Sequence, residues 1–156
     1  MRLDRTHLTL DELLGILDQR VRLFLDIKSA DRSAAQAVLE ALSRHRAESS
    51  TELCSKHWGV LAGLREARPS LTPFHSVSNR WRLRAFLGLL DSSIGPLALS
   101  VRQSLLDEEL VGHLQERGVH IYAWIVRQRW RAEELLRWGV HGITSDDLDL
   151  LAGLKS

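Results

Sequence analysis

Cysteine is almost absent from this sequence, and long hydrophobic runs are absent altogether. Cys54 stands alone, which excludes an intramolecular disulfide and fits a reducing compartment. No apolar run approaches the roughly 18 residues that a membrane span needs, and the first residues lack the pattern of a secretory signal. A net charge of +1 gives no overall reason to expect nucleic acid or an anionic membrane as a partner. These absences predict a cytoplasmic protein without a membrane span.

The chain does contain one repeated sequence pattern. A short apolar segment is followed by a polar turn and then by an amphipathic segment. Strands are expected at residues 21–28, 51–56, 74–78, 97–101, 120–126 and 140–144. Helices are expected at residues 9–18, 32–45, 57–68, 80–91, 107–117 and 129–138. Strict alternation predicts a parallel sheet with helices outside it, and units of this length favour a (β/α) barrel over an open sheet.

Local signals support these boundaries. Thr9 and Glu12 have the spacing of a capping box, which satisfies free amide groups at a helix start. Gly118 and Gly139 each follow a predicted helix and are favoured residues for its C-terminal cap. Gly95-Pro96 is expected to break the chain before the fourth strand. No low-complexity linker divides the sequence, so residues 1–156 are predicted to form a single domain.

The segment from Val21 to Lys28 is the most informative one. Its apolar run ends in Asp26 and Lys28, which lie two residues apart and therefore on the same face of a strand. At the carboxyl end of a parallel strand, the two groups could hold a cation and an anionic group together, as a phosphate-ester site requires. The alternative is an ion pair that closes a strand, and the pair of residues alone favours that alternative.

Other sequence patterns are weaker evidence of function. Cys54 and His57 could be a thiol and its base, but a small buried thiol is the favoured interpretation. The seven histidines show no helical metal-ligand spacing. Arginine alternates with aromatic residues in 80–84 and 127–131, as in some single-strand binders. Outer helices with arginine stems over apolar surface explain this pattern without a ligand and are favoured, so nucleic acid is not predicted as a partner.

Several motifs together resemble the glycerophosphodiester phosphodiesterases. Leu25-Asp26-Ile27-Lys28 is similar to that family's Glu-any-Lys strand, with aspartate in place of glutamate. The other four matching segments are Thr9–Leu14, Ser55–Leu61, Tyr122–Val126 and Gly139–Asp146. Their order and spacing agree with the family over nearly the whole chain. Each motif is weakly specific, but five in the right sequence are a stronger signal.

The resemblance implies a fold and an activity. The family fold is a TIM-type barrel of eight units, and its reaction is the metal-assisted hydrolysis of a glycerophosphodiester to an alcohol and glycerol 3-phosphate. The family's His-Arg-Gly, Glu-any-Asp and His-Asp motifs, which supply the acid, the base and two metal ligands, do not occur in this sequence. The chain is therefore expected to be a partial α/β barrel with the last six of the eight units, a single incomplete domain with very low or no activity.

The resemblance also assigns roles to particular residues. Asp26 matches the family's later metal-binding glutamate, with a side chain one methylene shorter, and the expected cation is magnesium or calcium. Lys28 would bind the phosphate as a point charge. Trp124 matches a family tryptophan and would form a wall of the substrate pocket, although a barrel-core aromatic is an equal alternative. Lys56 and Arg127 are expected to complete that pocket.

Further positions near the predicted strand ends are weaker candidates. His57, His75 and Arg102 could contact an anionic ester, while a solvated loop position is the safer expectation for each of them. Arg127 replaces the family's asparagine and His141 replaces its aspartate, so the last two loops depart from the common pattern.

Three functions remain open. The chain could be part of a phosphodiesterase whose small-molecule substrate is a phosphodiester. It could also be a non-catalytic module that binds an anionic ligand, or a protein-interaction module derived from the same fold. An incomplete barrel leaves two open strand edges beside an apolar interior, and such edges favour self-association.

Overall fold

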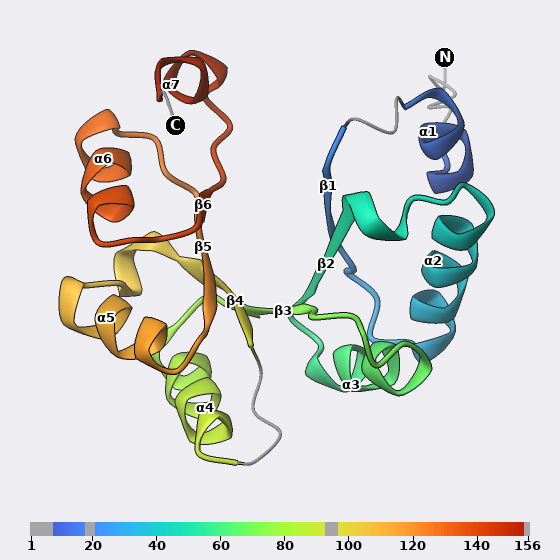
Figure 1. The fold of residues 1–156 in the computed structure, drawn as a ribbon, viewed down its shortest axis with the longest axis horizontal. Coiled ribbons are helices and arrows are strands. Elements are labelled where there is room, and N and C mark those ends of the chain that lie inside the picture. Colours follow the sequence, from blue (N-terminus) through green and yellow to red (C-terminus); the bar gives the residue numbers. More distant parts are fainter. Residues whose placement is uncertain (1–7, 18–20, 93–96, 155–156) are drawn as a thin grey trace, which may run out of the picture.

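The computed structural model describes residues 8–17, 21–92 and 97–154. Its strands form one parallel sheet in which every neighbour in space is also the neighbour in sequence. They are β1 (Leu23–Asp26), β2 (Thr51–Ser55), β3 (Phe74–Val77), β4 (Ala98–Arg102), β5 (His120–Trp124) and β6 (Gly142–Ile143). The sheet is strongly curled, with β1 and β6 at its two ends (Figure 1). The described residues therefore form an α/β fold of the partial TIM-barrel type, as the sequence predicts.

The helices cover only the outer side of the curled sheet (Figure 1). They are α1 (Leu10–Ile16), α2 (Arg32–Arg44), α3 (Trp58–Ala67), α4 (Arg80–Leu90), α5 (Glu108–Glu116), α6 (Arg129–Arg137) and α7 (Leu148–Gly153). Most begin at a short polar residue whose side chain accepts a first-turn N–H, and these N-caps are Thr9, Asp31, Asn79, Asp107 and Asp147. Such caps satisfy backbone donors that have no helical partner, which fixes where each strand-to-helix turn ends.

The two faces of the sheet have different neighbours. On the outer face, alternate residues such as Leu53, Leu99 and Ile121 are buried against the helices. On the concave face a separate cluster forms, in which Phe24 and Tyr122 pack against the buried residues Cys54, Phe74 and Ala98. This is the period-two alternation of a strand, and it places every second side chain inside the curl.

Tyr122 spans the concave face. Its ring centroid lies 4.5 Å from that of Phe74 and 5.3 Å from that of Phe24. Its hydroxyl donates to Glu52 Oε2 at 2.8 Å, so β5 and β2 are joined across the inside of the curl. Burial and the neighbouring Glu52 carboxylate raise the pKa of Tyr122 to about 12, which keeps the hydroxyl protonated as a donor.

The structure confirms the six predicted strands and the six predicted helices, with shifted ends. β1 ends at Asp26, so Lys28 lies beyond the strand, and β6 is only two residues long. The short helix α7 is not predicted from the sequence, because six residues are too few to show a helical period. The predicted break at Gly95-Pro96 lies outside the described residues. None of the described helices has both the length and the apolar character needed to cross a membrane.

Gly139 should be a sensitive position for stability. It has φ of +93°, and a Cβ built there would lie 2.2 Å from the amide nitrogen of Gln115, which donates to the Gly139 carbonyl at 2.7 Å. We expect Gly139→Ala to lower the free energy of unfolding by about 1–2 kcal/mol, because a side chain is disfavoured at positive φ.

Gly112 is the matched control, because it lies within α5 and a built Cβ would meet nothing within 4 Å. Gly112→Ala should raise the free energy of unfolding by about 0.5–1 kcal/mol. Urea denaturation of both variants measures the difference. Equal changes in the two variants would contradict the assigned role of Gly139.

Candidate active site at the carboxyl edge of the sheet

Asp26 and Lys28 meet at the carboxyl end of β1. The Lys28 ammonium donates to Asp26 Oδ2 in a direct ion pair, and both residues are exposed. The chain brings together the acid and the base that the sequence singled out. The carboxylate already has a cationic partner, so it is less available to a metal ion, and the lysine is held close to the strand end.

A buried serine joins the ends of β1 and β2. Ser55 Oγ donates to the carbonyl of Ile27 at 2.7 Å and accepts the N–H of His57 at 3.0 Å. The N–H of Ile27 also donates to the carbonyl of Cys54 at 2.7 Å, which extends the pairing beyond Asp26. Because adjacent strands lie about 4.8 Å apart, the backbones leading to Lys28 and Lys56 are next to each other.

The ends of β4, β5 and β6 carry a second group of polar residues. Arg102 and Trp124 are the last residues of β4 and β5 and are partners in the sheet register. Arg127 forms a two-pronged contact with Asp146, with Nε to Oδ1 at 2.9 Å and Nη2 to Oδ2 at 2.6 Å. This guanidinium lowers the pKa of Asp146. Arg127 is therefore held in place by a carboxylate that follows β6.

His75 does not lie at the carboxyl edge, so the alternative that it contacts an ester there was wrong. It is the second residue of β3, and its side chain is buried between the sheet and the helices, with ring centroids 5.3 Å from Trp58 and 5.7 Å from Phe86. The expected solvated loop position was also wrong. Alternation in β3 explains both results, because His75 follows the inward-facing Phe74 and must point outward.

Cys54 is a buried thiol on the concave face, 1% exposed. Burial, and then the nearby charge of Asp26, raise its pKa to about 11. A thiol with so high a pKa is a poor nucleophile at neutral pH. The structure thus favours the structural interpretation of Cys54.

Arg82 is a candidate residue that sequence reasoning missed. It belongs to the alternating arginine and aromatic pattern of 80–84, which was interpreted as an outer helix face. Its Nη1 donates to the carbonyl of Lys56 at 2.7 Å, so the side chain reaches from α4 to the end of β2. Its spacing in the helix could have shown this, because Arg82 lies four residues before the buried Phe86 and therefore on the same side of α4.

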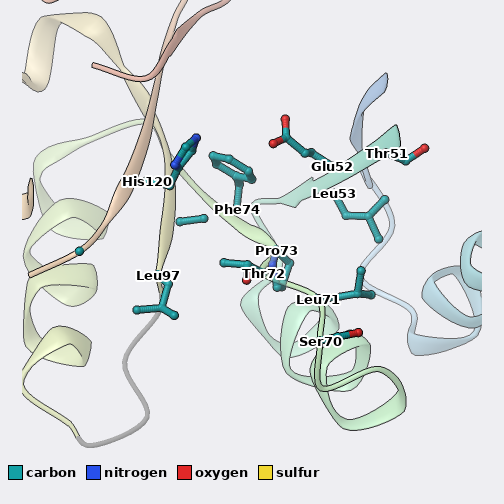
Figure 2. A pocket seen from close by; sticks show the side chains of 12 residues that line it. Thr51, Glu52, Leu53, Ser70, Leu71, Thr72, Pro73, Phe74, Leu97 and His120 are labelled. Carbon is teal, nitrogen blue, oxygen red and sulfur yellow. The ribbon is translucent and has the colours of Figure 1, made fainter. Parts of the chain in front are cut away.

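A pocket of about 390 Å³ lies at the opposite, amino-terminal edge of the sheet. Figure 2 shows Glu52, Phe74 and His120 projecting toward it from β2, β3 and β5. In parallel barrels the chemistry is found at the carboxyl ends of the strands. This pocket is therefore separate from the residues that the sequence singled out.

The described residues do not fit a divalent cation by themselves. Asp26 is the one predicted metal ligand, and it is paired with Lys28. Within residues 8–17, 21–92 and 97–154, no three His, Cys, Asp or Glu side chains gather closely enough to hold a metal ion. Hard cations such as magnesium and calcium need several oxygen ligands. A cation at Asp26 would need further ligands from elsewhere.

The curled parallel sheet, with helices on its outer side and charged residues at its carboxyl edge, defines a protein of the (β/α)-barrel class. The sequence pattern of the glycerophosphoryl diester phosphodiesterase family matches residues 16–150. The chain therefore belongs to this family, as its sequence motifs indicate. A comparison of the chain with curated proteins found no match.

Solved structures show the same fold. A glycerophosphodiester phosphodiesterase from Parabacteroides distasonis superimposes with a TM-score of 0.74 at 19% identity, covering 92% of this chain and 62% of that protein. The enzyme from Thermotoga maritima gives 0.71 at 19% identity, with 94% and 63% covered. A phosphodiesterase from Oleispira antarctica, in complex with its product sn-glycerol-3-phosphate, gives 0.59 at 22% identity, with 74% and 46% covered. The chain thus spans about half to under two-thirds of the length of these relatives.

His75 should make stability fall in acid. Burial lowers its pKa from the ordinary value of 6.5 to about 4, so the folded protein favours the neutral ring. A lowered histidine pKa gives stability that is present above pH 6.5 and is lost as the pH falls toward 4, by at most about 1.4 kcal/mol per pH unit.

We expect His75→Gln to remove this part of the pH dependence. The exposed His113 on α5 supplies the control variant His113→Gln, which should leave the slope unchanged. Urea unfolding between pH 7.5 and pH 4.5 measures both. An identical slope in the wild type and in His75→Gln would show that the ring titrates normally.

Proposed function

We propose that this chain is the Lys28-containing part of a glycerophosphodiester phosphodiesterase site, with very low or no hydrolytic activity of its own. The family membership and the carboxyl-edge position of Asp26 and Lys28 support the site. The single observation that carries the proposal is the junction of β1 and β2 at Ser55, because it holds Lys28 and Lys56 on adjacent strand ends.

In this proposal the phosphate group of a small-molecule diester binds Lys28. The lysine is a mobile point charge that can follow the phosphoryl oxygens as negative charge develops on them. Lys56, Trp124 and Arg127 would form the surrounding pocket, with the indole of Trp124 as an apolar wall. Asp26 would orient Lys28 through their ion pair.

The proposed lack of activity rests on the sequence. The motifs that carry the family's acid and base histidines do not occur in these 156 residues. General acid–base catalysis contributes about 10²–10⁴-fold to a rate, so a site without those groups would be slow even when it binds its substrate. The same proposal holds that this chain is a truncated form of the family site, and that a complete site would need a divalent cation.

The second candidate function is a non-catalytic module that binds an anionic ligand or another polypeptide. The specific observation in its favour is that β1 and β6 each pair with one neighbour only in the described sheet. Unpaired strand edges bind other strands, and Phe24 beside the edge is only partly buried. Self-association through these edges is part of this alternative.

Hydrolysis assays test the main proposal. The purified chain is given glycerophosphoglycerol with magnesium or calcium, beside Asp26→Ala and Lys28→Ala. We expect no turnover above background from any of the three, together with weak binding of sn-glycerol 3-phosphate that Lys28→Ala lowers by roughly tenfold. Metal-dependent turnover that both variants abolish would show instead a working site assembled without the family histidines.

Sedimentation velocity tests the open edges. Across a hundredfold range of protein concentration, we expect a sedimentation coefficient that rises with concentration, because unpaired parallel edges attract one another. Introducing a charge beside the edge strand through Val21→Lys should reduce this association, whereas the matched change at the equally exposed Leu136 of α6, Leu136→Lys, should not. A monodisperse monomer at all concentrations would remove the interaction module from consideration.

A further inference from the structure

A cavity of about 470 Å³ lies at the carboxyl end of β2, between the starts of α3 and α4. Lys56, His57, Gly59 and Arg82 supply its polar lining, and Trp58 supplies an aromatic surface. It is separate from the pocket at the other edge of the sheet, with which it shares no lining residue. No acidic side chain lines it, so every ionised group around the cavity is a cation.

Arg82 is held in position over the cavity. Its Nη1 donates to the Lys56 carbonyl at 2.7 Å, and its guanidinium carbon lies 5.9 Å from the centroid of the Trp58 ring. Among the described residues, neither Arg82 nor Lys56 forms an ion pair, unlike Lys28 and Arg127. Two cations are thus gathered without a carboxylate to balance them, and one of them is already ordered.

The backbone adds to the positive potential. α3 begins at Trp58, and the side chain of its N-cap residue, His57, makes no capping hydrogen bond. The first-turn N–H groups of Trp58 and Gly59 have no helical acceptor, and the helix dipole directs partial positive charge toward the cavity. A Cβ built on Gly59 would meet nothing within 4 Å, so the backbone there is open to a ligand.

The cavity adjoins the proposed phosphate position. Ser55 bonds both the carbonyl of Ile27 and the N–H of His57, so the β1 end that carries Lys28 is tied to the start of α3. A ligand held at Lys28 can therefore reach the cavity with its other end. A cationic end would meet positive charge there with no acidic side chain in the lining to offset it.

We propose that this cavity binds a second anionic group, a phosphate monoester or a carboxylate, on the alcohol part of the diester substrate. Arg82 and Lys56 are the specificity-determining residues, with Arg82 giving two parallel hydrogen bonds and Lys56 a point charge. The inference rests on the proposed function and narrows it to diesters with an acidic headgroup. Quaternary ammonium headgroups are disfavoured, because the Trp58 ring is already faced by Arg82.

Binding of two ligands that differ by one phosphate tests this specificity. Glycerophosphoglycerol and its terminal phosphate monoester are titrated by calorimetry into the wild type, Arg82→Gln, Arg84→Gln and Lys28→Gln. Arg84 is the matched control, because it is exposed on the same helix and forms no ion pair among the described residues. Unchanged near-ultraviolet circular dichroism of the tryptophans confirms that each variant is folded.

We expect the phosphorylated ligand to bind the wild type and Arg84→Gln at least roughly tenfold more tightly, the effect of one charge-assisted hydrogen bond. In Arg82→Gln the ratio should fall toward one, with the affinity for glycerophosphoglycerol unchanged. Lys28→Gln should weaken both ligands equally and preserve the ratio. Equal binding of both ligands to the wild type would overturn the second anion site and leave the proposed function standing.

Inorganic phosphate tests the cavity independently of the diester. In ¹H–¹⁵N spectra of the wild type and of Lys28→Gln, phosphate should shift the amide signals of Trp58 and Gly59, and in Arg82→Gln these shifts should be lost. Shifts that persist in Arg82→Gln, or their absence from the wild type, would refute the anion site. If the shifts are present but neither diester binds the wild type, then the proposed function fails and the assignment to a diester fails with it.

Discussion

Parallel pairing of the strands in chain order is the constraint on which the other features of this structure depend. Each strand is followed by a helix on the outer side, so successive strands run in the same direction and their carboxyl ends meet at one edge. Because helices cover one face only, alternate residues face either the helices or the inside of the curl. Tyr122 is one of the residues that face the inside of the curl. Its ring packs against Phe74 there, and its hydroxyl donates to Glu52.

At the carboxyl edge, the balance of charge separates residues that look alike in sequence. Lys28 and Arg127 are each neutralised by a carboxylate, Asp26 and Asp146 respectively. Lys56 and Arg82 have no such partner among the described residues, although Arg82 is ordered by the carbonyl of Lys56. The β2 side of the edge is consequently more positive than the β5 and β6 side. An anionic ligand would be drawn toward β2, where the backbone N–H groups of α3 begin.

Membership of the family does not by itself give this chain the family's metal site. The motifs that place the chain in the family follow one another along nearly its whole length, and they are visible in the amino-acid sequence alone. The surroundings of the predicted metal ligand, Asp26, cannot be seen in the sequence. Asp26 lies where the resemblance places it, yet its ion pair with Lys28 and the lack of a gathered ligand set in the described residues leave it without the surroundings that a cation needs.

Predictions from the sequence were right where the signal was local. Short apolar segments located all six strands, and the glycines after α5 and α6 take positive φ at 118 and 139, as helix ends of this type require. Errors arose where one residue of register decides the outcome. His75 was expected in a solvated loop, with contact to a ligand as the weaker alternative, but it directly follows Phe74 on β3 and therefore points to the helices. β1 was predicted two residues too long at each end, because the pairing that sets its bounds depends on β2.

The sequence by itself determined the order of the strand and helix units, the family, and the placement of Asp26 and Lys28 together at a strand end. The units and the strand-end pair follow from periodicity and spacing within short segments, which neighbouring residues decide, whereas the family follows from the resemblance of several motifs. Only the tertiary structure decided that Ser55 joins β1 to β2, that Tyr122 reaches Glu52, and that Arg82 reaches Lys56. Those contacts join residues between 26 and 70 positions apart, and the curl of the sheet, to which every strand contributes, brings them within hydrogen-bonding distance.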